Sequence, residues 1–448
     1  MGLTKYNAFY FKDYAFDEST GTLLLRYAYE DGPLFEEKYV FPMGTRVLSE
    51  NDRRALDGAF RLIFLMAGVS YYKAYIPSNL RCLAFPLDAK MAAFVEKVYR
   101  NGLGEFAYRN KVEVKLSVFS EEVEAPSPVD LSLMHRCLVP VGGGKDSAVT
   151  IEILRCAKEP ITLFATGSGT GLATPIQKTI DVSGLPSLAV KRSISPRLLE
   201  LNRDGALNGH VPITAILSGV AVACAILHGI DTVVFSNENS SSAPNVVLDD
   251  LEINHQYSKS LAFETDFAEI VRASITPSLR YFSLLRPLTE AEIARRFAKL
   301  EKYHPVFRSC NTAFRQDEKL RGKTWCCDCP KCRFVFLALA PFIDKDKLIG
   351  IFGQNMLADL TQMEGFRELC GLAAHKPFEC VGEVEESALL MRKLSLMPSW
   401  KDDGIVAQLS ANLGLLGEDF DDKFKALFMN RSDHRLSEHD LGMLHACR

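Results

Sequence analysis

Residues 137–150 read Cys-Leu-Val-Pro-Val-Gly-Gly-Gly-Lys-Asp-Ser-Ala-Val-Thr, and this stretch decides the fold. The apolar run up to Val141 predicts a short buried strand, and the pattern after the three glycines predicts an amphipathic helix. A helix start has unpaired N–H groups, and glycines let a backbone approach a phosphate closely. Lys145 adds a cation and Ser147 adds a hydroxyl donor. The stretch therefore predicts a phosphate-binding loop; the alternative is a glycine-rich turn that binds no ligand.

Two common phosphate loops do not fit these residues. A Walker A loop needs glycine at position 139 and Ser or Thr at position 146, which are Val139 and Asp146 here, and the last glycine of G-x-G-x-x-G is replaced by Ser147. The stretch instead resembles the S-G-G-x-D-S loop of the N-type (PP-loop) ATP pyrophosphatases, with Gly142 in place of the first serine. That resemblance implies cleavage of ATP to AMP and diphosphate. It also implies nucleotide contacts from Gly142, Gly143, Gly144, Lys145, Asp146 and Ser147.

The composition limits the class of protein. The 448 residues suit two or three domains, and 47% hydrophobic with 24% charged residues is typical of a soluble globular chain. The net charge of −4 weighs against a nucleic-acid partner. No run of about twenty apolar residues is present, and the N-terminus lacks the apolar core of a signal peptide. We therefore expect a cytoplasmic protein without a membrane partner.

The order of predicted elements indicates three regions. Residues 6–42 alternate apolar and polar positions, which predicts an antiparallel meander, and two helical patterns follow it. A proline-containing polar segment at 121–130 predicts the first boundary. We expect an N-terminal α+β domain over 1–130, a pyrophosphatase domain over 131–305, and a cysteine-rich segment with a mostly helical region over 306–448.

Strand and helix patterns alternate in the middle region, which predicts an α/β fold with a doubly wound parallel sheet like that of the adenine-nucleotide α-hydrolases. The predicted strands are 137–141, 161–165, 187–191 and 231–236, and the predicted helices are 147–157, 174–182, 212–228 and 288–301.

Polar residues follow the second and fourth of these strands. In such sheets ligands bind beyond the carboxyl ends of strands, so Thr166, Ser236, Asn237 and Glu238 are candidate nucleotide contacts. Exposed loops without a ligand are the alternative. His210 precedes the apolar helix, and His255 lies in the polar segment 254–259; both are candidate catalytic residues, with a purely structural role left open.

A cysteine cluster follows at 310–332. Cys326, Cys329 and Cys332 form two overlapping C-x-x-C steps, and Cys310 lies upstream. This spacing lets four thiolates converge on one ion, which predicts a structural zinc site; an iron–sulfur cluster or metal-free thiols are the alternatives. The arrangement resembles the end of the preQ0-forming nitrile synthases, which are pyrophosphatases of the same superfamily but about half this length.

The whole layout resembles the UDP-N-acetylmuramoyl-L-alanyl-L-glutamate epimerases of peptidoglycan precursor synthesis. They share this length, a G-G-G-K-D-S loop after a non-catalytic N-terminal domain, and a cysteine-rich segment. The resemblance implies that a UDP-linked muropeptide is the substrate, that its terminal L-glutamate becomes D-glutamate, and that ATP and Mg²⁺ are required.

The chemistry implied by this resemblance needs a phosphate cation, a magnesium ligand and a base. Lys145 and Asp146 are the candidates for the first two roles. The candidates for the base are His210, His255, Glu238 and Cys327. Two other functions stay open: a pyrophosphatase that forms a nitrile, an amide or a thiolated base, and a zinc-stabilised binding protein with an inactive loop.

Overall fold

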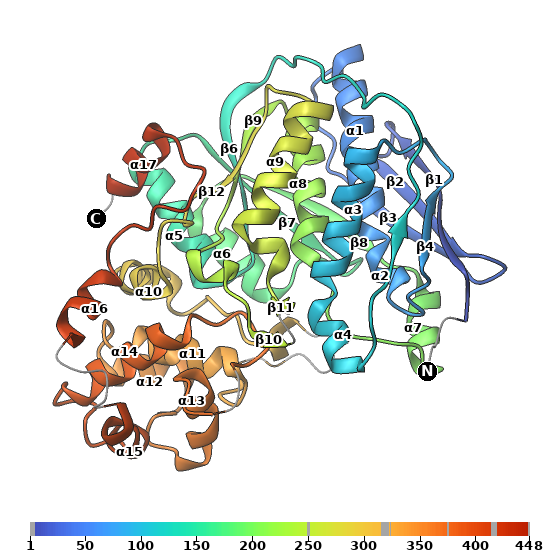
Figure 1. The fold of residues 1–448 in the computed structure, drawn as a ribbon. Helices are drawn as coiled ribbons and strands as arrows, with labels where there is room; N and C mark the ends of the chain where they lie inside the picture. Colours follow the sequence, from blue (N-terminus) through green and yellow to red (C-terminus); the bar gives the residue numbers. More distant parts are fainter. Residues whose placement is uncertain are drawn as a thin grey trace.

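The computed structural model describes residues 5–248, 251–314, 322, 324–373, 376–413 and 419–446. A ten-stranded mixed sheet runs through the molecule in the order β12-β9-β6-β7-β8-β3-β2-β1-β4-β5, with helices on both faces (Figure 1). The predicted α/β class is confirmed. The sequence did not indicate that the N-terminal meander and the later parallel strands join in one sheet.

The N-terminal half of the sheet begins with the predicted meander. It comprises β1 (Ala8–Asp17), β2 (Thr22–Tyr29) and β3 (Leu34–Val40), and β4 (Asn79–Cys82) and β5 (Ser117–Val118) extend it. Alternate side chains of β2 are buried on one face. On that face the Tyr27 hydroxyl donates to the carbonyl of Phe64 at 2.9 Å. The helices of this half are α1 (Glu50–Ala67), α2 (Val69–Tyr72), α3 (Ala89–Gly102) and α4 (Gly104–Asn110).

The other half is parallel. It contains β6 (Met134–Pro140), β7 (Ile161–Gly167), β8 (Ser187–Ser193), β9 (Ile230–Phe235) and β12 (Arg280–Ser283). The chain runs outward from β6 through β7 to β8 and then returns to place β9 and β12 on the other side of β6. Parallel strands covered on both faces carry continuous apolar runs. Leu138 accordingly packs into one core and Val139 into the other.

The two halves meet where β3 pairs antiparallel with β8. The junction is stabilised by an ion pair between Arg192 and the fully buried Glu37, at 2.7 Å. The register of such a pairing depends on residues about 150 positions apart, which explains why sequence patterns alone did not reveal it.

Helices cover the parallel half on both faces. On one face α8 (Ile213–His228) and α9 (Leu261–Ser274) lie beside α1 and α3 (Figure 1). On the other face α5 (Lys145–Cys156), α6 (Thr174–Ser183) and α10 (Glu290–Ala298) pack into the second core. The remaining elements of this part are α7 (Pro196–Arg203), the hairpin β10 (Val246–Leu248) and β11 (Leu251–Ile253), and the short 3₁₀ helices η1 (Asn239–Ser242), η2 (Tyr257–Lys259) and η3 (Glu301–Tyr303).

The C-terminal part is mostly helical, as predicted, and packs against α10 and α5 (Figure 1). Its α-helices are α11 (Pro330–Leu339), α12 (Lys345–Phe352), α13 (Met363–Leu369), α14 (Val384–Ser395), α15 (Gly404–Leu413), α16 (Phe420–Ala426) and α17 (Glu438–His445), and η4 (Asn311–Phe314) and η6 (Leu360–Gln362) are short 3₁₀ turns. Across the described residues, no helix combines the length and apolar character needed to cross a membrane. The domain boundaries at 130 and 305 stay predictions.

Candidate active site

The glycine loop joins β6 to α5 at the carboxyl edge of the parallel strands, where the sequence predicted it. Gly143 has a φ of +78°, and a Cβ there would lie 2.9 Å from the backbone nitrogen of Ile176. This position therefore requires glycine. Gly144 is the N-cap of α5 and offers no side chain, so the first N–H groups of the helix remain available to an anion.

A cavity of about 380 Å³ opens over this loop. The cavity brings together polar residues from the ends of β6, β7 and β9, which are distant in sequence. The hydroxyl of Ser236 is buried and lacks a hydrogen-bond partner among the described residues, as expected of a group that binds a ligand. The predicted nucleotide contacts that line the cavity are Gly142, Gly144, Lys145, Asp146, Ser147, Thr166, Ser236, Asn237 and Glu238; Gly143 is not among the lining residues.

Lys145 is a buried cation in this cavity. Its Nζ lies 2.5 Å from Asp146 Oδ1 and also pairs with Glu290. Burial alone would lower the pKa of Lys145, but the two carboxylates outweigh that effect and raise it. The ammonium therefore stays charged.

Three carboxylates line the same cavity: Asp146, Glu238 and Glu290. Carboxylate oxygens are the ligands that Mg²⁺ prefers when it accompanies a nucleotide. The Asp146 side chain is 35% exposed, whereas the other two residues are buried. The donor set fits magnesium, and Asp146 is the best placed of the three to reach it. Glu290 was not predicted from the sequence.

Arg286 links two segments of the cavity wall, the loop after β9 and the 3₁₀ helix η2. It is fully buried and donates to the carbonyl oxygens of Glu238 and Lys259, each at 2.6 Å. It also pairs with the buried Glu264 at 2.8 Å. The guanidinium thus fixes the loop after β9 against η2, and both segments contribute residues to the cavity wall.

The predicted catalytic residues His210 and His255 lie next to each other, with ring centroids 4.1 Å apart. Neither is among the residues that line the cavity. His255 Nδ1 is hydrogen-bonded to Glu105, a buried residue of α4. Burial would lower the pKa of His255, but Cys380 and Glu105 raise it to about 9. Burial and the neighbouring His255 lower the pKa of His210 to about 3, so the two imidazoles differ in charge near neutral pH.

Cys380 and Lys259 are cavity residues that the sequence analysis did not single out as catalytic. Lys259 Nζ donates to Cys380 Sγ at 3.4 Å. Burial would raise the pKa of this thiol, but Lys259, Lys331 and His255 lower it to about 6. The sequence around Cys380 shows only a single cysteine in an irregular segment between helices. It could not indicate an activated thiol, because Lys259, Lys331 and His255 come from distant segments of the chain.

The four predicted zinc ligands, Cys310, Cys326, Cys329 and Cys332, converge. Their sulfur atoms lie within 4.8 Å of one another. Cys332 Sγ is 3.6 Å from Cys326 Sγ and 3.5 Å from Cys329 Sγ. Four such sulfurs at this spacing suit a tetrahedral Zn²⁺ with bonds of about 2.3 Å. The zinc would have a closed thiolate shell and hence a structural role.

Cys327 is separate from that cluster. Its Sγ contacts the carbonyl of Phe352 at 3.3 Å, and it does not line the cavity. Burial raises the pKa of this thiol to about 11. Of the four base candidates named from the sequence, only Glu238 reaches the cavity wall.

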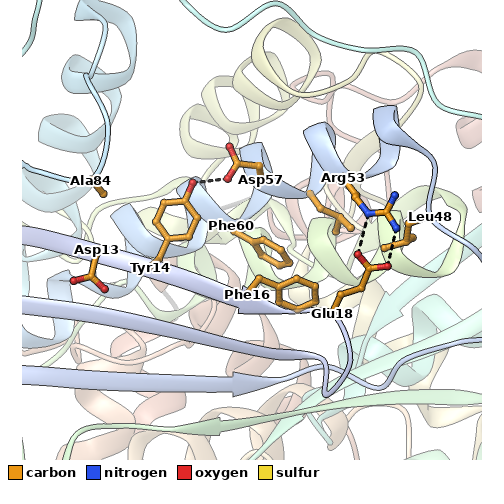
Figure 2. Close-up of a pocket in the computed structure, with 10 residues that line it drawn as sticks. Asp13, Tyr14, Phe16, Glu18, Leu48, Arg53, Asp57, Phe60 and Ala84 are labelled. Atoms are coloured by element: carbon orange, nitrogen blue, oxygen red, sulfur yellow. Dashed lines mark hydrogen bonds and ion pairs between the residues drawn. The ribbon is translucent and has the colours of Figure 1, made fainter.

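A second cavity, of about 520 Å³, lies between β1 and α1 (Figure 2). Tyr14 donates to Asp57 at 2.5 Å there, and Arg53 pairs with Glu18 at 2.9 Å. None of the predicted site residues lines it. The chemistry-bearing residues therefore concentrate at the carboxyl edge of the parallel strands.

Two family models match the chain. The MurL N-terminal domain matches residues 2–284, and the MurL C-terminal domain matches residues 306–423.

Three relatives carry the name UDP-N-acetyl-alpha-D-muramoyl-L-alanyl-L-glutamate epimerase. The protein of Xanthomonas oryzae pv. oryzae is 41% identical over 433 residues, which cover 96% of this chain and 95% of the relative. The proteins of Salinispora tropica and a Micromonospora species are 43% and 42% identical, each over 91% of this chain and over 89% and 91% of their own lengths. The chain therefore belongs to the MurL family of UDP-N-acetylmuramoyl-L-alanyl-L-glutamate epimerases.

Proposed function

We propose that this protein inverts the terminal L-glutamate of UDP-N-acetylmuramoyl-L-alanyl-L-glutamate to D-glutamate through an acyl-adenylate, with release of AMP and diphosphate. One observation carries the ATP-dependent part of the proposal. A single cavity holds the uncapped start of α5, the charged Lys145 and the unpartnered hydroxyl of Ser236. Because ATP is the co-substrate, we place the reaction in the cytoplasm.

Activation by ATP has a clear physical purpose in this reaction. The stereocentre lies next to the α-carboxylate, and removing its proton from the free acid would create a dianion. Adenylation removes the carboxylate charge and makes the α-proton accessible to a side-chain base. Hydrolysis of the adenylate by water then releases the inverted product and AMP.

Different residues of the cavity would bind the phosphates, the magnesium ion and the nucleoside. The N–H groups after Gly144 and the Lys145 ammonium bind and orient the phosphates. Bound magnesium, held by Asp146, would neutralise charge on the leaving diphosphate. Thr166, Ser236 and Asn237 would contact the ribose and adenine. The tetrad that contains Cys310 and Cys332 would hold a structural zinc.

We also assign the parallel half to the doubly wound PP-loop type. Its strand order β8-β7-β6-β9-β12 reverses direction at β6, and the glycine loop leaves β6 at that point. In open α/β sheets, ligands bind where the strand order reverses. The position of the loop supports nucleotide binding at this edge, and the likeness of its residues to the S-G-G-x-D-S loop favours an ATP pyrophosphatase.

The test is incubation with the UDP-linked L-glutamate substrate, ATP and Mg²⁺ in D₂O. Acid hydrolysis followed by chiral analysis and mass spectrometry is expected to show D-glutamate with deuterium at the α-carbon, together with AMP. Labelling should require ATP, because the free carboxylate holds the α-proton too tightly. Consumption of ATP to AMP while the glutamate stays L and unlabelled would refute the epimerase function. Formation of ADP would refute the pyrophosphatase chemistry.

A further inference from the structure

We propose that Cys380 is the catalytic base that removes the α-proton of the activated glutamate, and that Lys259 and His255 are positioning residues that hold it as a thiolate. This proposal rests on the function proposed above. Cys380 lines the same cavity as the glycine loop and is half-buried there. A base in this position faces the space into which an adenylated substrate must enter.

The segment that carries Cys380 is anchored on several sides. Asn245 donates to the carbonyl of Pro377 at 2.8 Å, and Asn311 donates to Glu379 at 2.6 Å. Lys331 pairs with Glu379 at 3.6 Å. These contacts come from three separate parts of the chain. The thiol is therefore held at the cavity wall although its segment is not helical.

A line of polar groups leads away from the thiol. His255 favours the thiolate form of Cys380, and its Nδ1 is hydrogen-bonded to Glu105. Glu105 in turn accepts from Arg109 at 2.5 Å, and the Arg109 side chain is 56% exposed. A cysteine next to a protonated imidazole is the usual arrangement for an activated thiolate. Arg109 and His255 stabilise the Glu105 carboxylate, and that carboxylate in turn favours the protonated imidazole of His255.

The charges around Cys380 favour the base form at neutral pH. Lys259, Lys331 and His255 together lower the pKa of the thiol to about 6, despite the opposing effect of burial. A general base works best when its pKa lies near the operating pH. In the same environment His255 has a pKa of about 9 and so retains its proton.

Two of the three carboxylates on the described part of the cavity wall are paired with the lysine of the nucleotide loop. Asp146 and Glu290 both pair with Lys145. The third, Glu238, accepts from the Ser240 hydroxyl at 3.5 Å, and its backbone carbonyl accepts from Arg286. Cys380 instead contacts Lys259, which is a member of neither ion pair.

The Cys380 thiolate takes the α-proton and becomes a thiol, and the electron pair of the C–H bond moves onto the acyl oxygen to form an enolate. A solvent water gives a proton to the opposite face of the α-carbon as the enolate electrons return. The hydroxide left behind is neutralised by the thiol proton, which Cys380 gives up directly to solvent in the cavity that it lines. The enzyme ends the cycle with the thiolate restored.

Two assays separate this step from activation. Substrate-dependent exchange of labelled pyrophosphate into ATP reports adenylation, and deuterium incorporation at the glutamate α-carbon reports proton transfer. We expect Cys380→Ala and Cys380→Ser to keep the first and to lose the second by about 10²- to 10⁴-fold. Cys82→Ala is the matched control, because Cys82 is also half-buried but lies on β4, far from the cavity lining.

The outcomes are distinguishable. Deuterium incorporation at the wild-type rate in either Cys380 variant overturns the proposal. Loss of both activities in folded Cys380 variants also overturns it, because Cys380 would then act in adenylation. Absence of both activities in the wild-type protein would instead refute the proposed function itself.

Discussion

Lys259 Nζ lies 3.4 Å from Cys380 Sγ, although the two residues are 121 positions apart in the chain. Lys259 ends a 3₁₀ turn before α9, and Cys380 precedes α14. The contact joins the parallel half of the molecule to its helical C-terminal part, directly at the cavity that holds the glycine loop. The reactivity of the thiol therefore depends on how these two parts pack.

This relationship predicts a pH dependence. Cys380 needs to be deprotonated to act as a base, so α-deuterium incorporation should rise as the pH increases through about 6. Removing the ammonium in Lys259→Met takes away a charge that favours the thiolate, so the rising limb should shift to higher pH. The variant keeps the other charged groups near the thiol, which are His255 with its partner Glu105 and Lys331 with its partner Glu379. The measurement is the initial rate of incorporation from pH 5 to 9; an unshifted profile in the variant would contradict the role of Lys259.

Thiol alkylation provides a test that needs no substrate. Iodoacetamide reacts with thiolates, so Cys380 should be modified at pH 7 faster than a cysteine with an ordinary pKa. Mass spectrometry of peptides would follow Cys380 and, as an internal reference, Cys82, whose pKa is raised by burial. Equal modification rates at the two positions would argue against an activated thiol.

Asp146→Asn tests the nucleotide loop. The substitution preserves the shape of the side chain but removes the charge expected to bind magnesium. AMP formation should fall by about 10²- to 10³-fold, the usual cost of losing one stabilising electrostatic contact. The fold should persist, since the Asp146 side chain is 35% exposed. Asp181→Asn, at an exposed position of α6, is the control, and equal AMP formation by both variants would count against the assignment.

Cys329→Ser tests the zinc site, and Cys327→Ser is its control. The first variant removes a predicted ligand, whereas the second changes a thiol that points toward Phe352. Elemental analysis of protein purified without chelators should find zinc in the wild type and in Cys327→Ser, and much less in Cys329→Ser. Stability should fall with the metal, because metal binding contributes to folding free energy. Normal zinc content in Cys329→Ser would refute the tetrad.

Arg286→Met tests the buried support of the cavity. The change leaves Glu264 as an unpaired buried charge and frees two loop carbonyls. Breaking a buried ion pair from one side costs about 3–5 kcal/mol, so the denaturant midpoint should fall clearly. Arg53→Met, which breaks an exposed pair with Glu18, should leave the midpoint nearly unchanged. Equal midpoints for the two variants would contradict a structural role for Arg286.

Local patterns in the sequence were sufficient to predict several features of the structure. The order of apolar strand, glycines and amphipathic helix located the loop after Val141, because that information lies within fifteen consecutive residues. The alternation in residues 6–42 predicted the meander, and the cysteine spacing predicted which four sulfurs converge. Each of these features depends on neighbours in the chain, which a periodicity or a spacing can report.

Only the tertiary structure decided the rest. It joined β3 to β8 in one sheet, placed His210 and His255 behind the cavity wall, and brought Cys380 to Lys259. The sequence determined that a glycine loop between strand and helix and a cysteine cluster exist, since both are contiguous motifs. Packing between segments more than one hundred residues apart decides which side chains share a cavity. It also decides which thiol is ionised, because burial and distant charges set the pKa of a thiol. No local sequence pattern records either effect.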